Sequence, residues 1–92
     1  MVQKDEKSGK VKFICSLDPT ARRVYLAGDF NDWDPEDRRM VKVRDGSFRA
    51  NLELEPGTYQ YKFVVDGEWM PDPSAREQVP NEHGTTNSVI RV

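Results

Sequence analysis

The stretch that decides the fold is TYQYKFVVDGEW, which runs from Thr58 to Trp69. Every second residue of Tyr59–Val65 is large and apolar, so these side chains share one face of an extended segment. The segment is rich in aromatic and β-branched residues, which favours a strand. Asp66-Gly67 tolerates positive φ at both central positions of a type I′ turn. The stretch therefore predicts a strand that turns back at once and brings Trp69 close to Lys62.

Short apolar or alternating runs predict further strands on both sides of this hairpin. They cover residues 10–17, 23–28, 40–44, 47–54 and 88–92. Asp45-Gly46 predicts a second two-residue hairpin, and Glu55-Pro56-Gly57 predicts a type II turn with positive φ at the glycine. No segment carries an apolar stripe at helical spacing. About seven strands joined by turns predict an all-β, immunoglobulin-like sandwich.

The length of 92 residues indicates a single domain. Residues 1–9 are polar and show no period, so we expect a disordered N-terminal tail there and the β-sandwich domain over residues 10–92. Several prolines between Met70 and Thr86 predict a long irregular segment before the last strand.

The composition argues against several classes of partner. The 14 basic and 16 acidic residues nearly balance, so no strong field would attract a phosphate backbone and no nucleic acid is expected. Cys15 is the only cysteine, and its alternating surroundings predict a buried thiol without a disulfide. No apolar signal segment or membrane span is present, so we expect a cytoplasmic protein that does not contact a membrane.

No group of residues predicts catalysis. A glycosidase needs one acid with a raised pKa and a second carboxylate at a defined separation, whereas the carboxylates here lie in turns and on exposed strand faces. The single histidine, His83, lies in a polar loop with no nucleophile motif near it. Asp29-x-Asn31 begins like a calcium loop but is not followed by the required glycine and glutamate. We expect no enzyme activity, no cofactor and no bound metal.

Two tryptophans indicate a binding surface instead. Trp33 and Trp69 lie in segments whose other residues are polar, so no local apolar pattern predicts that they are buried. An indole plane can stack on the apolar C–H face of a pyranose ring, which removes apolar area from water on both partners. Lys62 and Asn87 supply groups that hydrogen-bond sugar hydroxyls. From these residues alone, a sugar site, a protein-docking patch and purely structural tryptophans all remain possible.

Three blocks occur in the order VYLAGDFNDWDP, LEPGTYQYKFVVDGEWMPDP and NEHGTTNSVIRV, and together they resemble the family 48 carbohydrate-binding modules. These are early-set immunoglobulin-like domains found at the N-terminal side of isoamylases, pullulanases and glycogen branching enzymes. They also form the glycogen-binding domain of the AMP-activated protein kinase beta subunit. The resemblance covers residues 10–92. It implies non-catalytic binding of α-1,4-linked glucan, such as glycogen, starch or maltooligosaccharide, and a glycogen- or starch-active enzyme or a regulatory protein as partner.

The resemblance also implies which side chains bind the glucan. The six expected carbohydrate-binding residues are Trp33, Lys62, Trp69, His83, Thr85 and Asn87. The two tryptophans match the family's stacking residues, and Lys62 and Asn87 match its contacts with sugar hydroxyls. Thr85 matches the family's threonine, whereas His83 replaces a long apolar residue that packs against the glucan in kinase-type members. The alternative function is a sandwich that docks a catalytic or regulatory partner without binding sugar.

Overall fold

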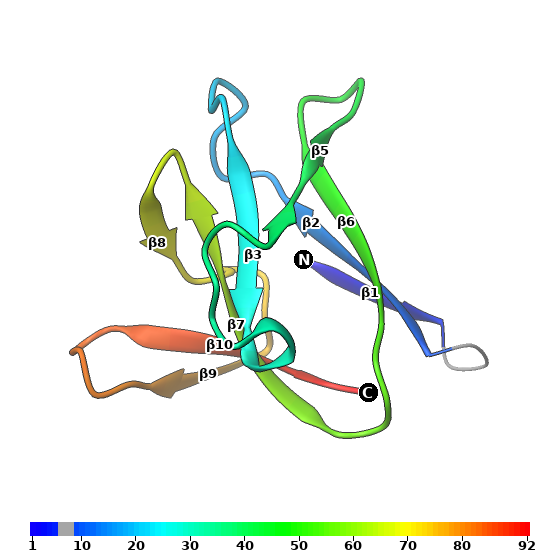
Figure 1. Cartoon of the computed structure of the whole chain (residues 1–92), viewed down its shortest axis with the longest axis vertical. Helices are drawn as coiled ribbons and strands as arrows, with labels where there is room; N and C mark the ends of the chain where they lie inside the picture. The colour runs from blue at the N-terminus through cyan, green and yellow to red at the C-terminus, as the bar shows by residue number, and fades with distance from the viewer. Residues whose placement is uncertain (6–8) are drawn as a thin grey trace.

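The protein folds as two antiparallel β-sheets that pack face to face (Figure 1). A computed structural model describes residues 1–5 and 9–92 of the chain. The first sheet contains, in order, β1 (Val2–Asp5), β2 (Lys10–Cys15), β6 (Phe48–Glu53) and β5 (Val41–Lys42). The second contains, in order, β4 (Arg38–Arg39), β3 (Val24–Gly28), β7 (Thr58–Val65), β10 (Thr86–Arg91) and β9 (Glu77–Pro80), with β8 (Glu68–Met70) paired to β7. The predicted all-β sandwich is confirmed.

The second sheet is built around β7. One side of β7 pairs with β3, and the other side is shared by β10 along its first half and β8 along its second half. The predicted alternation is confirmed, because Tyr61, Phe63 and Val65 are at most 3% exposed and face the first sheet. The Tyr61 ring meets the ring of Phe13 from β2 edge to face, with centroids 5.1 Å apart. This aromatic contact joins the two sheets.

The rest of the core also comes from both sheets. Cys15 is 1% exposed, as predicted, and burial raises the pKa of its thiol. Besides the residues named above, the core contains Val11, Ala21, Val24, Leu26, Met40, Phe48, Ala50 and Ile90. Burial of each large apolar side chain contributes about 1.5–3 kcal/mol, so this layer between the sheets provides most of the stability.

The predicted disordered tail is wrong for Val2–Asp5, which form β1. This strand pairs with β2 from Val2 opposite Phe13 to Asp5 opposite Lys10. Backbone groups on the edge of a sheet can hold a strand whose own side chains show no period, so the sequence pattern did not reveal it. Residues 6–8 of the expected tail lie outside the described residues.

The two Asp-Gly turns differ from each other. Asp66 has φ 47° and Gly67 has φ 87°, as the predicted two-residue type I′ hairpin requires. The second prediction, a two-residue hairpin at Asp45-Gly46, is wrong. Val43 N donates to Ser47 O at 2.9 Å, which leaves a three-residue loop in which only the glycine has positive φ. The Asp45 carboxylate stabilises this longer loop by accepting hydrogen bonds from Ser47 N and Ser47 Oγ.

Two other local predictions are also wrong. Gly57 does not have the positive φ of a type II turn; it is held by Val92, whose N and O atoms both hydrogen-bond the Gly57 backbone. The segment expected to be irregular contains β9, in which Pro80 is the last residue, so only one hydrogen-bond donor of the β9–β10 ladder is lost.

The described part of the chain has ten strands, because several short edge strands add to the seven expected. Among the described residues no helix could span a membrane.

Candidate functional site

A groove of about 570 Å³ lies on the face of the second sheet that points away from the core. Its walls come from the segment after β3, from the outward residues of β7, from β8 and from the β9–β10 hairpin. We call it the tryptophan groove. All six residues predicted from the sequence line it: Trp33, Lys62, Trp69, His83, Thr85 and Asn87. The structure thus brings together side chains that are up to 54 positions apart in the sequence, from Trp33 to Asn87.

Trp33 is held at one end of the groove by a strained backbone and a specific hydrogen bond. Asp32 and Trp33 both have left-handed backbones, with φ of 55° and 59°, which is unusual for a bulky residue and costs about 1–2 kcal/mol. The indole Nε1 of Trp33 donates to Asp29 Oδ1 at 3.1 Å. The second carboxylate oxygen of Asp29 accepts from Gln60 N of β7 at 2.8 Å. Asp29 therefore ties the indole to the sheet.

The segment that carries Trp33 depends on a close backbone approach. A Cβ added at Gly28 would lie 2.6 Å from Gln60 O and 2.8 Å from the Phe30 ring, so no larger residue fits there. The Asn31 side chain closes the short 3-10 helix η1 (Asp29–Asn31) by accepting from Gly28 N and donating to Leu26 O. Asn31 is therefore a structural residue. The sequence Gly-Asp-Phe-Asn places the tryptophan.

Trp69 is placed by the β7–β8 hairpin. It lies directly opposite Val64 in the ladder, so its side chain emerges on the same outward face as Lys62. The Asp66 carboxylate accepts hydrogen bonds from Arg22 N and Arg23 N, which anchors the turn to the segment before β3. Trp69 is 43% exposed. Trp33 is partly exposed as well, so both indoles keep apolar area in contact with water.

Lys62 lies at the floor of the groove and is only 5% exposed. Its Nζ donates to Thr85 Oγ1 at 2.9 Å, and it forms no ion pair with any described residue. An ammonium group has three donors, so two remain for other acceptors. Thr85 Oγ1 also accepts from Asn81 Nδ2, at 2.7 Å, which leaves its own O–H free to donate. Both side chains therefore hold unused donors at the groove surface.

Asn87 belongs to a chain of amide hydrogen bonds across the groove floor. Its Nδ2 donates to Gln60 Oε1, and its Oδ1 accepts from Asn81 Nδ2, both at 3.0 Å. A side-chain amide has two N–H groups and two lone pairs, so Asn87 retains one donor and one acceptor site. The network fixes the orientation of the amide while leaving it able to bind a hydroxyl group.

The rim beyond this network is formed by the β9–β10 loop. Asn81 Oδ1 accepts from His83 N and Thr85 N, and Gly84 has φ of 79°, so the loop is a tight turn around the Asn81 side chain. The imidazole of His83 is 80% exposed and lies 3.8 Å from the carboxylate of its neighbour Glu82. His83 therefore contributes an edge to the groove and little to its floor.

Four residues that line the groove were missed at the sequence level: Asp29, Gln60, Asn81 and Glu82. Gln60 could have been found, because it lies two residues from Lys62 on the same strand face. Asn81 could have been recognised as a turn residue, but its contact with Asn87 depends on strand register. The bond between Asp29 and Trp33 depends on the left-handed backbone between them. No local sequence pattern predicts that backbone.

Comparison with known proteins agrees with this geometry. The sequence pattern of the family described as the glycogen recognition site of AMP-activated protein kinase matches residues 10–92. The chain is 41% identical over 71 residues to 5'-AMP-activated protein kinase subunit beta-1 of Sus scrofa, a match that covers 77% of this chain and 55% of that protein. It is 43% identical over 72 residues to Protein FLOURY ENDOSPERM 6, chloroplastic, of Oryza sativa subsp. japonica, covering 78% of this chain and 13% of that one.

A solved structure gives the same result for the fold. The maltogenic amylase from S. marinus superposes with a TM-score of 0.76 and 26% sequence identity, over 90% of this chain and 13% of the amylase. The chain thus spans about half of the pig relative and a small part of the rice protein and the amylase. The resemblance noted in the sequence is confirmed, and the chain belongs to the glycogen recognition site family of AMP-activated protein kinase, within the family 48 carbohydrate-binding modules.

Proposed function

We propose that this domain binds α-1,4-linked glucan in the tryptophan groove and does not transform it. The observation that carries the proposal is the convergence of two partly exposed indoles, from separate elements, on one groove whose polar groups keep unused hydrogen-bonding capacity. A glucan offers the matching chemistry, since each pyranose ring has apolar faces and a rim of hydroxyl groups. The family's description as a glycogen recognition site supports the same ligand.

The two classes of contact have different roles. The indoles of Trp33 and Trp69 stack on sugar rings and supply most of the affinity through the apolar area that they remove from water. Lys62, Asn87 and Thr85 bind hydroxyl groups and so select the orientation of the chain. A small, water-exposed site of this kind rarely exceeds about 8 kcal/mol of binding free energy, so we expect a micromolar or weaker Kd.

Binding without turnover is supported by the state of the groove carboxylates. Both oxygens of Asp29 accept hydrogen bonds from protein donors, which suits a structural acceptor. Glu82 lies at the exposed rim beside His83 and does not point into the floor formed by Lys62 and Asn87. Glycoside hydrolysis needs two carboxyl groups that face each other across the scissile bond, whereas Asp29 is occupied by protein donors and Glu82 lies at the rim.

The relatives support a proposal for the domain's wider role. They include a kinase subunit and a chloroplastic protein, each longer than this chain. We propose that the domain brings a glycogen- or starch-active enzyme, or a regulatory protein, to the glucan. We also propose the cytoplasm as its compartment, where the buried thiol of Cys15 would stay reduced.

Affinity electrophoresis in gels that contain glycogen tests the binding function. The wild-type domain should be retarded, and Trp33→Ala and Trp69→Ala should each migrate as they do without glycogen. Val41→Ala is the matched control, because Val41 is 66% exposed on β5 and lies outside the groove. Folded tryptophan variants that remain as retarded as the wild type would contradict the proposal.

A further inference from the structure

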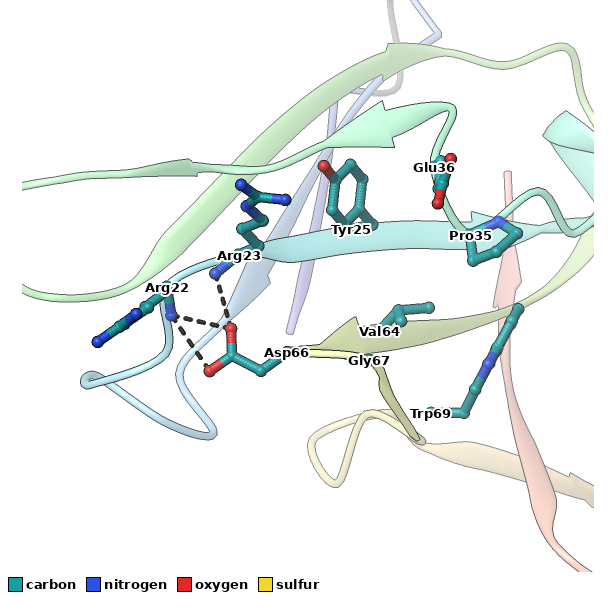
Figure 2. A pocket seen from close by; sticks show the side chains of 9 residues that line it. All are labelled: Arg22, Arg23, Tyr25, Pro35, Glu36, Val64, Asp66, Gly67 and Trp69. Atoms are coloured by element: carbon teal, nitrogen blue, oxygen red, sulfur yellow. Dashed lines mark hydrogen bonds between the residues drawn. The ribbon is translucent and has the colours of Figure 1, made fainter.

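A second hollow, of about 590 Å³, lies beside the tryptophan groove on the outer face of the same sheet. Figure 2 shows the side chains that line it. We call it the Tyr25 hollow. Trp69 lines both cavities and is the only one of the described residues that they share. Its indole therefore forms the partition between them, and a ligand that follows the groove past Trp69 enters the hollow.

The floor of the Tyr25 hollow is a row of three side chains across neighbouring strands. Val64 of β7 lies opposite Tyr25 of β3 on one side and opposite Trp69 of β8 on the other. Adjacent strands are about 4.8 Å apart, so the two aromatic residues are separated by roughly twice that distance, with the smaller Val64 between them. Val64 is 4% exposed, which shows that it lies at the base of the row. Tyr25 and Trp69, with Val64 between them, thus form an apolar floor on which a ring of a ligand can pack.

Polar side chains, several of them without a partner among the described residues, surround this apolar floor. Figure 2 shows Arg22 and Arg23 at one end and Pro35 and Glu36 at the other. Among the described residues the Asp66 carboxylate accepts only from the backbone N–H groups of the two arginines, at 2.9 and 2.8 Å. Their guanidinium groups, the Tyr25 hydroxyl and the Glu36 carboxylate have no hydrogen-bond or ion-pair partner among the described residues. These four groups can donate to and accept from a ligand.

The charges around the hollow favour an uncharged polar ligand. Two arginines face two carboxylates, Asp66 and Glu36, so the lining has no net charge. A phosphate or an acidic peptide would lie close to both carboxylates and would be opposed by them. A sugar hydroxyl, in contrast, can accept from a guanidinium and donate to a carboxylate at the same time. The apolar floor and the mixed polar rim thus fit a glucose unit.

We propose that the Tyr25 hollow is an additional glucose subsite that takes the end of an α-1,4-glucan chain too long for the tryptophan groove. This inference rests on the proposed function, because the chain must first occupy the groove. Trp69 stacks on the sugar in the groove and limits the hollow on its other side. Tyr25 packs against the additional sugar, while the arginines and Glu36 bind its hydroxyl groups. The subsite makes the domain prefer longer chains.

Calorimetric titration of the domain with maltotriose and maltoheptaose tests the subsite. The wild type should bind maltoheptaose more tightly than maltotriose. Tyr25→Ala should weaken maltoheptaose binding by roughly threefold to tenfold, the value of one or two hydrogen bonds with their packing, and should leave maltotriose binding unchanged. The double variant Arg22→Ala, Arg23→Ala should weaken maltoheptaose binding in the same way. It should leave the anchor of the β7–β8 turn intact, because the Asp66 carboxylate accepts from backbone N–H groups at these two positions.

The control is Arg44→Ala, which removes an exposed guanidinium outside both cavities. It should leave both affinities unchanged. The subsite would be overturned if its variants lost equal affinity for maltotriose and maltoheptaose, or lost affinity for neither. The proposed function would still stand. If Tyr25→Ala fails to fold, the double arginine variant decides between these results. If the wild type bound neither maltotriose nor maltoheptaose, the proposed function would be overturned, and the subsite with it.

Discussion

The two faces of β7 carry residues of the same strand but differ in how they satisfy their polar groups. The inward face presents Tyr61 and Phe63, each at most 1% exposed, to the core between the sheets. The polar groups of this face are paired: the Tyr61 hydroxyl donates to the buried carboxylate of Asp72, and the Tyr59 hydroxyl donates to Glu55 O, both at 2.7 Å. The outward face presents Gln60 and Lys62, whose bonds to Asn87 and Thr85 leave further donors unused.

This difference separates stability from binding along a single strand. A face whose polar atoms are all paired and whose apolar atoms are packed contributes to folding and offers nothing to a ligand. A face with fixed but incompletely paired polar groups can bind hydroxyl groups at little cost in reorganisation. Because side chains alternate, a substitution at one position of β7 should affect one property and spare the other.

Phe63→Ala should have the largest effect and should act on stability alone. It removes a ring that is 1% exposed and packs against Tyr61, with centroids 5.9 Å apart. Loss of a buried phenyl group costs about 3–5 kcal/mol, which is a large part of the stability of so small a domain. Urea denaturation followed by circular dichroism measures the change. A loss below about 1 kcal/mol would show that the inward face is not the packed core.

Lys62→Met at the neighbouring position should act in the opposite way. The change keeps the aliphatic stem but removes the ammonium donors, so maltoheptaose affinity should fall roughly tenfold. Stability should change by no more than about 1 kcal/mol, since replacing a buried charge by an apolar side chain of similar shape is often neutral. Calorimetry and urea denaturation of the same variant test both statements. Unchanged maltoheptaose affinity together with a large loss of stability would contradict the distinction between the inward and outward faces of β7.

Asp29→Ala should have a smaller effect on binding, because Asp29 acts through Trp33. Without its carboxylate the indole N–H loses its acceptor and the ring is less firmly held, so maltoheptaose affinity should fall by roughly twofold to fivefold. Asp37→Ala, in the same loop but outside the groove, is the matched control and should bind normally. The Trp33 indole should also become more mobile, which fluorescence anisotropy measures. Wild-type affinity and anisotropy in Asp29→Ala would exclude this positioning role.

The smallest effect is a loss of stability at alkaline pH that originates on the inward face. Burial, together with the hydrogen bond to Asp72, raises the pKa of Tyr61 above its ordinary value of 10.0. The unfolded chain therefore loses the phenolic proton first, so the stabilising contribution is complete below pH 10.0 and declines as pH rises beyond it. Urea denaturation between pH 9 and 11 should show a steeper decline for the wild type than for Tyr61→Phe. An equal decline of stability with pH in the wild type and in Tyr61→Phe would contradict a raised pKa of Tyr61.

Much of this arrangement was predictable from the sequence, because it depends on local rules. The alternation along β7 and the positive φ values at Asp66-Gly67 follow from side-chain period and turn chemistry, and they place Lys62 and Trp69 on one face. The six expected site residues also lie together in the structure. Their roles in binding remain to be tested.

The features that could not be predicted depend on contacts between distant segments. β1 exists because β2 offers it an open edge, and Gly57 lacks the expected positive φ because Val92 pairs with it. The loop at Asp45-Gly46 gains a third residue because the Asp45 carboxylate caps Ser47. In each case a partner outside the local pattern determines the backbone, which explains why periodicity and turn propensities gave the wrong result.

The central claim, that both indoles on the outer face contact the glucan, can be tested by NMR. The protein has two tryptophans, so an ¹⁵N-labelled sample gives two indole N–H resonances that report on the groove separately from the core. Both resonances should shift progressively and saturate as maltoheptaose is added, and cellohexaose, a β-1,4-linked glucan, should shift them much less. Indole resonances that do not move at millimolar maltoheptaose would contradict the account.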